Sequence, residues 1–114
     1  MLPQINRLKK EKDIKKVLKE GEALNEEVLV LKVIKNNLKN SRFGFIISGK
    51  ISKKATIRNK IKRRLSETIR TKIKKIKTGA DGLFIVKPGI EKKEIQDVDK
   101  IINKILFRAN LLND

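Results

Sequence analysis

The 114-residue sequence predicts an α+β fold, in which three helices pack against a small, mostly antiparallel sheet. Three observations lead to this prediction. Several segments repeat apolar residues at helical spacing. Short runs of branched apolar residues lie between turn-forming residues and indicate strands. A hydrophobic fraction of 39% beside a charged fraction of 38% suits a folded chain with a highly charged surface. We therefore expect a single domain over residues 1–114.

The first three elements are expected to be a helix and two strands. Apolar residues at positions i, i+3 and i+4 predict a helix over 11–20, and Gly21 follows as a stop. Residues 27–35 and 42–48 are rich in branched apolar side chains and flank a polar turn, so we expect two antiparallel strands. Gly44 inside the second strand indicates a bulge or a close approach of another segment.

The second half of the chain is expected to hold a long helix, a strand and a further helix. Within 50–77, isoleucine or leucine recurs every four residues from Ile57 to Ile73, which predicts an amphipathic helix of about five turns. Residues 83–86 form an apolar run between Asp-Gly and Pro-Gly, typical of a buried central strand. A helix with an acidic first turn is predicted from Glu91 onward.

The positive charge is concentrated in the long helix. The formal net charge is +17, and residues 50–77 contain thirteen lysines and arginines but one acid, Glu67. A solvated protein surface does not need this density of positive charge, so we expect a polyanionic partner. Charge alone leaves duplex DNA, structured RNA and anionic lipid open. The apolar stripe must cover the sheet, which disfavours a helix lying on a membrane. With only four aromatic residues, phosphate contacts should outweigh base stacking.

The composition excludes several kinds of chemistry. Without cysteine or histidine the chain has no disulfide, no thiolate metal site and no histidine acid–base group. A self-sufficient nuclease would need clustered carboxylates, and the candidates, Glu26 with Glu27 and Asp97 with Asp99, are better interpreted as surface charge. No apolar run is long enough to span a membrane, and the first residues lack the apolar core of a signal peptide. We expect a cytoplasmic protein with no membrane partner.

Three tracts occur in a distinctive order. Residues 6–10 read Asn-Arg-Leu-Lys-Lys, residues 42–45 read Arg-Phe-Gly-Phe, and residues 58–63 read Arg-Asn-Lys-Ile-Lys-Arg. Together they resemble the opening segment, the central strand and the signature basic helix of the bacterial ribonuclease P protein family. The resemblance extends over about residues 5–112.

This resemblance implies a fold and a function. The family fold is a compact α/β sandwich with a left-handed strand–helix–strand crossover, against the usual right-handed rule. The family protein is a subunit of the endoribonuclease ribonuclease P. It binds the catalytic RNA subunit and the 5′ leader of precursor tRNA, and it supports metal-dependent removal of the leader. By resemblance the RNA carries the chemistry and holds most of the Mg²⁺. The protein then has no catalytic residue, and no DNA partner is expected.

The resemblance also assigns site residues. The contacts to the catalytic RNA are assigned to Arg58, Asn59, Lys60, Lys62 and Arg63, with support from Arg7, Lys9 and Lys10. The leader cleft, between the first helix and the sheet, is assigned Ile14, Leu18, Leu31 and Ser48. Lys60 replaces an arginine of the family motif, which keeps the charge but loses the bidentate fork. The three apolar cleft residues replace aromatic ones. A ribosomal protein or a general RNA chaperone is the alternative function.

Overall fold

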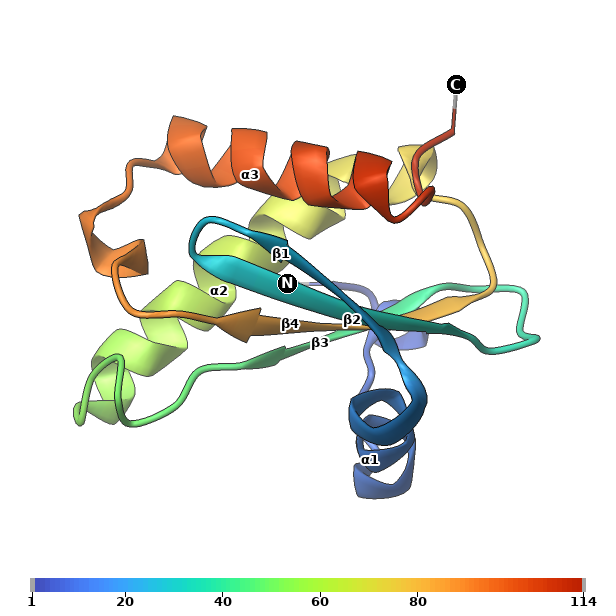
Figure 1. The fold of residues 1–114 in the computed structure, drawn as a ribbon, viewed down its shortest axis with the longest axis horizontal. Coiled ribbons are helices and arrows are strands. Elements are labelled where there is room, and N and C mark those ends of the chain that lie inside the picture. The colour runs from blue at the N-terminus through green and yellow to red at the C-terminus, as the bar shows by residue number, and fades with distance from the viewer. Residues whose placement is uncertain (1, 114) are drawn as a thin grey trace.

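Residues 2–113 are described by a computed structural model, in which a four-stranded sheet lies between helices (Figure 1). The arrangement confirms the predicted α+β class. In chain order the elements are η1 Gln4–Asn6, α1 Glu11–Glu20, β1 Glu22–Glu26, β2 Leu29–Lys35, β3 Arg42–Ile46, α2 Ala55–Lys72, η2 Ile73–Lys75, β4 Ala80–Val86, η3 Ile90–Lys92 and α3 Ile95–Arg108.

The strand order is β1-β2-β4-β3, with antiparallel pairing of β1 to β2 and of β2 to β4, and parallel pairing of β4 to β3. Strands β2 and β3 run in opposite directions as predicted, but they do not pair, because β4 lies between them. As the most apolar strand, β4 gains most from the two-sided burial of a central position. The unit β3–α2–β4 is therefore a crossover between parallel neighbours. Its left-handedness stays a prediction.

Strand β1 is the element that the sequence does not predict, because Glu22–Glu26 is a mostly polar segment. The chain turns back after it at Glu27, which adopts a left-handed backbone conformation with φ of 48°. All five residues of β1 then pair with residues 29–33 of β2. Helix α3 lies beside it, and the Arg108 guanidinium donates a hydrogen bond to the Asn25 carbonyl at 2.5 Å. Tertiary contacts thus stabilise a strand that its own residues do not favour.

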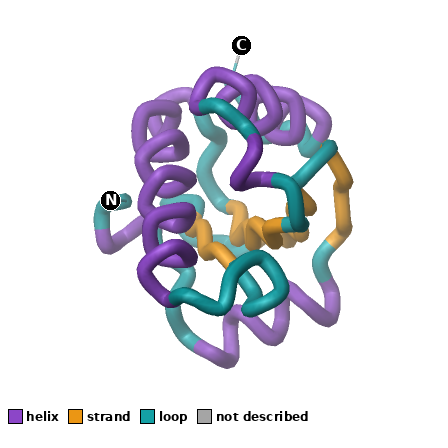
Figure 2. Tube along the Cα trace, turned by 90° about the vertical axis from the view of Figure 1, so that its left-hand side faces the viewer, coloured by secondary structure: helices purple, strands orange, loops and turns teal. Residues whose placement is uncertain are grey.

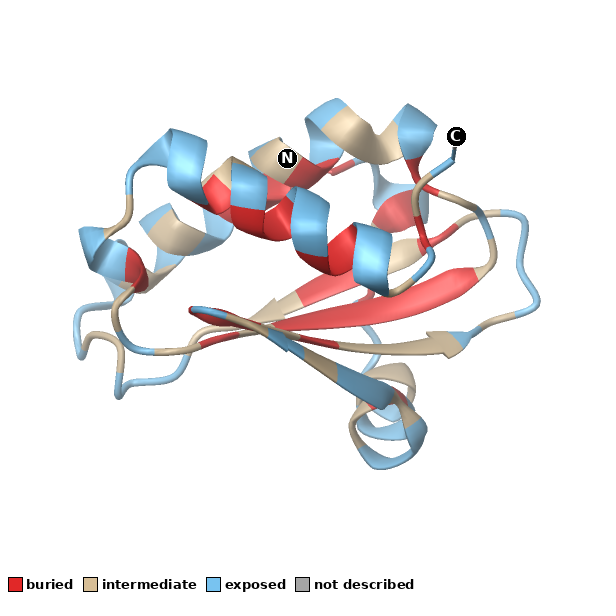
Figure 3. Cartoon of the chain, turned by 45° about the horizontal axis from the view of Figure 1, so that its top comes forward, coloured by how far each residue is buried: buried red, intermediate tan, exposed pale blue. Residues whose placement is uncertain are grey.

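Two helices cover one face of the sheet, and the third covers part of the other. Helices α2 and α3 lie on the same side, whereas α1 packs under one end of the opposite face (Figures 1 and 2). The main core lies between the sheet and α2 with α3, where Figure 3 shows the buried residues. Phe84 is fully buried there and stacks on Phe45, with ring centroids 5.7 Å apart. A smaller core under α1 contains Leu8, Val17 and Leu83.

Gly44 lies where the N-terminal segment crosses β3. A Cβ atom at this position would lie 3.0 Å from the Leu8 carbonyl oxygen and 3.1 Å from Leu83 Cδ1. The expected close approach is therefore present, and glycine is the residue that allows it.

Helix α2 buries its apolar stripe from the second turn onward. Leu65 and Ile69 are buried in the main core, whereas Ile57 at the start of the helix is 39% exposed. Ser66, which lies outside this stripe, is also buried. Helix α2 therefore presents a wider face to the protein than the stripe alone predicts. Within residues 2–113, no helix is long and apolar enough to cross a membrane.

An ion pair between neighbouring strands ties the sheet to its surroundings. The Arg42 guanidinium donates to both carboxylate oxygens of Asp81, at 2.9 and 2.6 Å. Asn36 Nδ2 also donates to this carboxylate, at 2.8 Å, and Arg42 reaches Asp13 of α1 at 3.4 Å. The hydrogen bonds from Arg42 to Asp81 raise the pKa of Arg42, although burial opposes the shift. One buried carboxylate thereby connects β3, β4 and the turn before β3.

We expect Asp81→Ala to lower the free energy of unfolding by about 3 kcal/mol, because it leaves Arg42 half-buried without its main partner. Urea unfolding at neutral pH measures the change. Asp13→Ala removes only the longer contact and should cost less than about 1 kcal/mol. Equal losses in the two variants would contradict the dominant role of the Asp81 pair.

Candidate nucleic-acid interface

The first half of α2 presents cations that the protein itself does not neutralise. Lys60, Lys62 and Arg63 are exposed, and none of them forms an ion pair with a carboxylate of residues 2–113. Asn59, between them, is exposed as well. Like charges three and four residues apart destabilise an isolated helix, so α2 depends on its packing against the sheet and on α3.

The one acidic residue of α2, Glu67, lies in the second half of the helix. Glu67 accepts hydrogen bonds from the Arg70 guanidinium at 2.7 and 3.0 Å, and these contacts lower the pKa of Glu67 to about 2. The carboxylate is therefore ionised at any physiological pH. The same hydrogen bonds to Glu67 raise the pKa of Arg70. The pair leaves the first two turns of α2 purely basic.

Arg58 differs from its neighbours because its guanidinium has a structural partner. Its Nη1 atom donates to the Ser52 carbonyl at 2.8 Å, and the side chain is half-buried. The Ser52 hydroxyl in turn accepts a hydrogen bond from the Lys54 backbone N–H at 3.2 Å. Arg58 thus holds the turn that leads into α2, in addition to contributing charge.

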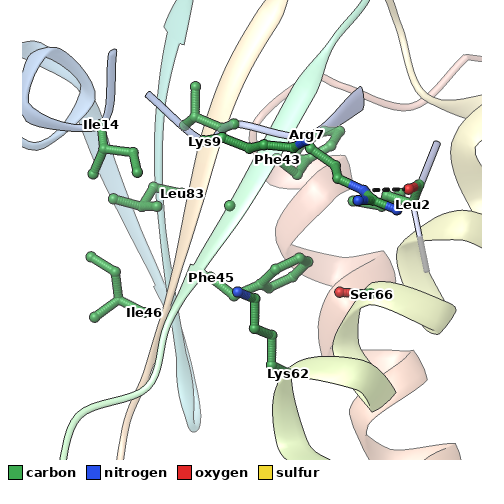
Figure 4. A pocket seen from close by; sticks show the side chains of 12 residues that line it. Leu2, Arg7, Lys9, Ile14, Phe43, Phe45, Ile46, Lys62, Ser66 and Leu83 are labelled. Carbon is green, nitrogen blue, oxygen red and sulfur yellow. Dashed lines mark hydrogen bonds between the residues drawn. The ribbon is translucent and has the colours of Figure 1, made fainter. Parts of the chain in front are cut away.

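A groove of about 320 Å³ runs along the outer edge of β3 (Figure 4). Its base is formed by Phe43, Gly44, Phe45 and Ile46 of that strand. Three of the cations assigned by resemblance surround it, and they come from separate parts of the chain: Arg7, Lys9 and Lys62. The fold brings them together because the N-terminal segment pairs with β3 and α2 crosses above the same edge.

The remaining assigned cations lie elsewhere. Lys10 is exposed immediately before α1 and does not line the groove. Arg63 lies on the flank of α2 that faces the start of α3, where it borders a hollow together with Arg64 and Ile95. The basic residues of α2 are therefore divided between two flanks of the helix, and only one flank shares the β3 groove.

The residues assigned to the leader cleft are also only partly together. Ile14 and Leu18 are half-buried and pack on the small core under α1, and Ile14 also borders the β3 groove. Ser48 is exposed beyond the end of β3. Leu31 is fully buried in the main core, on the α2 side of the sheet, and so it does not line the cleft. The alternation of side chains along β2 places the next residue, Lys32, toward α1 instead.

Sequence reasoning missed Lys32 as a contributor to this region. Its ammonium donates a hydrogen bond to the Leu18 carbonyl at the end of α1, at 2.8 Å. The signal was a single lysine within an apolar strand, because a cation in such a run favours the more open face of the sheet. Leu83 and Ile46, which were expected only as strand residues, complete the apolar surface beside α1.

The acidic candidates for metal-dependent hydrolysis are already engaged. Glu26 lies 3.1 Å from the Lys104 ammonium and 2.8 Å from the Arg108 guanidinium, and these partners, Lys104 first, lower the pKa of Glu26. Glu27 contacts Lys93 at 3.2 Å. Among residues 2–113 no three acidic side chains are placed to hold a metal ion. These carboxylates do not fit a magnesium site made by the protein alone.

Comparisons with known proteins agree on one family. Residues 2–110 match the family described as Ribonuclease P. The chain is 31% identical over 109 residues to the ribonuclease P protein component of Alkaliphilus oremlandii, covering 96% of this chain and 95% of the relative. Identity to the component from Clostridioides difficile is 35% over 105 residues, with 91% of each chain covered. The solved RNase P protein of Thermotoga maritima has a TM-score of 0.82 at 31% identity, covering 90% of this chain and 96% of that one.

We expect Lys60→Ala combined with Arg63→Ala to weaken binding to a structured RNA and to flatten its salt dependence. Each lost phosphate contact removes up to about one unit from the log–log slope of affinity against salt, so the slope should fall by one to two units. Fluorescence anisotropy at several salt concentrations measures it. The matched control, Lys92→Ala with Lys100→Ala, removes two exposed cations away from α2. An equal change in slope for both pairs would contradict a specific role for α2.

Proposed function

The chain belongs to the ribonuclease P protein family, and on this premise we propose that it binds the catalytic RNA subunit and the 5′ leader of precursor tRNA. In this role it supports metal-dependent endonucleolytic removal of the leader. The proposal is carried by one observation: the exposed cations in the first half of α2 have no protein partner within the described residues. A polyanion supplies the missing counter-charges.

The chemistry of cleavage is assigned to the RNA in this proposal. The chain has no histidine or cysteine, and three of its four candidate carboxylates are paired with lysine or arginine, namely Glu26, Glu27 and Asp99. We propose that Mg²⁺ is held mainly by RNA. The protein would then act by neutralising phosphates and by positioning the two RNA partners. Cytoplasmic localisation, beside precursor tRNA in a bacterial cell, is part of the same proposal.

The leader is proposed to lie between α1 and the open part of the sheet. Support comes from the half-buried apolar side chains of Ile14 and Leu18, together with the Lys32 ammonium beside them. Helix α1 is held against the sheet by Arg42, which contacts Asp13 at 3.4 Å. Without aromatic side chains in the assigned positions, the leader would be bound through shape and apolar contact rather than by stacking.

The cleavage assay separates this function from the alternative of a ribosomal protein or general RNA chaperone. Added to a bacterial ribonuclease P RNA at low Mg²⁺, the chain should restore removal of the leader from precursor tRNA. A basic protein of the same size and net charge serves as the control. Equal stimulation by that control would contradict the proposal.

We expect Ile14→Asp to weaken binding of precursor tRNA about tenfold relative to mature tRNA, because it places a carboxylate opposite leader phosphates and removes an apolar contact. Affinities of the reconstituted holoenzyme for the two RNAs measure the effect. The exposed variant Lys16→Ser changes the net charge equally and should not discriminate. Equal weakening of both RNAs by Ile14→Asp, with loss of helical circular dichroism, would instead indicate unfolding of α1.

Replacing Glu26 and Glu27 with glutamine should leave the chemical step essentially unchanged. These residues lie on and beside β1, at the opposite edge of the sheet from β3. The single-turnover cleavage rate at saturating protein is the measurement. A hundredfold fall, about 2.7 kcal/mol in activation free energy, would favour a protein-based nuclease.

A further inference from the structure

Within the part of the chain that the structure describes, the outer edge of β3 carries backbone groups without a strand partner. The Leu8 N–H donates to the Phe43 carbonyl at 3.0 Å, so the backbone groups of Phe43 face this edge. Because backbone groups alternate between the two edges of a strand, the N–H and C=O of Phe45 face the same way. The N-terminal segment has left the strand by that point, since it bridges β3 only at Arg7 and Phe43. A donor and an acceptor therefore lie side by side at the base of the groove.

The two walls of the groove are apolar. On the α2 side the Phe45 ring lies beside Leu2 and Ser66, and on the other side Ile46 lies near Ile14 and the buried Leu83 (Figure 4). The Phe45 ring is held in place by its stacking on Phe84. Ser66 is the polar side chain of the α2 wall. Such walls favour a flat, weakly polar group over a fully hydrated one.

The rim of the groove is cationic. Arg7, Lys9 and Lys62 line it, and no acidic residue among 2–113 does. The Arg7 Nε atom donates to the Leu2 carbonyl at 2.6 Å, which fixes the guanidinium near the mouth. Lys62 extends from α2 toward Phe45 (Figure 4). We therefore expect a ligand with two parts. An uncharged group enters the groove, and an anionic group lies at the cationic rim.

These features of the groove together match a nucleotide as its ligand. A nucleobase offers flat apolar faces and an edge with adjacent donors and acceptors, and its phosphate matches the cationic rim. The volume of about 320 Å³ lies at the small end of ligand pockets, which suits one nucleotide. A paired base cannot turn its edge into such a groove, so the nucleotide must be unpaired. An extended peptide would also use the Phe45 edge, but it would not account for the three cations.

We propose that the groove at the free edge of β3 holds one unpaired nucleotide of the catalytic RNA, with its base against Phe45 and its phosphate beside Lys62. The inference rests on the proposed function and adds a site to it. The catalytic RNA is the occupant because Lys62 lies on α2 beside Lys60 and Arg63, the unpaired cations that the proposed function directs to that RNA.

The first experiment tests the site with small probes. Isotope-labelled protein is titrated with AMP or UMP and, separately, with ribose 5-phosphate, while backbone amide shifts are followed by NMR. The nucleotides should shift the amides of Gly44 to Ile46 more strongly than ribose 5-phosphate does. Equal shifts from all three probes would show a purely electrostatic surface and overturn the proposal, as would shifts that avoid β3.

The second experiment identifies the source of the nucleotide. Dimethyl sulfate modification of the catalytic RNA, with and without protein, should reveal an unpaired adenine or cytosine that becomes protected on binding. Lys62→Met should restore its reactivity at saturating protein. Lys60→Met removes the same charge from the same helix but outside the groove, and should leave the base protected.

Two results would overturn the site. One is a protection pattern that Lys62→Met and Lys60→Met change equally. The other is a Lys62-dependent protection found only in the leader of precursor tRNA. In both cases the wild-type protein would still bind the catalytic RNA and restore cleavage at low Mg²⁺, so the proposed function would survive. Absence of any binding to the catalytic RNA would instead contradict the proposed function itself.

Discussion

The burial of β4 is the constraint on which the rest of the structure depends. All of its residues except Ile85 are buried, and it pairs with β2 on one side and β3 on the other. A strand this apolar is stable only inside the sheet, so the segment between β3 and β4 must cross from one edge to the interior. That segment is α2. The position of the basic helix over the sheet is therefore a consequence of where β4 must lie.

The packing of α2 decides how its charge is presented. Leu65, Ser66 and Ile69 face the protein, so the cations of the first two turns must face solvent. The helix then divides them between two flanks, one shared with the β3 groove and one facing the start of α3. Since repulsion among these cations opposes helix formation, the apolar contacts of α2 are what hold the charges in place. A helix that would be only marginally stable alone thus holds its cations in a fixed geometry.

Charge pairing separates the molecule into two kinds of surface. On the β1 and α3 side, Glu26 is held between Lys104 and Arg108, and Glu27 lies against Lys93. In the first half of α2, Lys60, Lys62 and Arg63 lack such partners among residues 2–113. The proposed function uses the second surface, and the first shows why the acids of this chain are poor candidates for catalysis. In the proposed function the protein neutralises phosphates, a role that needs unpaired cations rather than reactive side chains.

The sequence by itself determined the helices, the buried strand and the location of the positive charge, because periodicity and composition are local properties. The tracts at 6–10, 42–45 and 58–63 likewise sufficed to indicate the family. The tertiary structure alone decided the strand order and the existence of β1, since neither follows from local pattern. It also placed Leu31 in the main core rather than beside α1, because β2 carries branched apolar side chains on both faces and only the packing of the helices decides which face each helix covers. The groove beside β3 has the same origin: its residues come from the N-terminal segment, α1, β3, α2 and β4, and only the packing of these five segments brings them together.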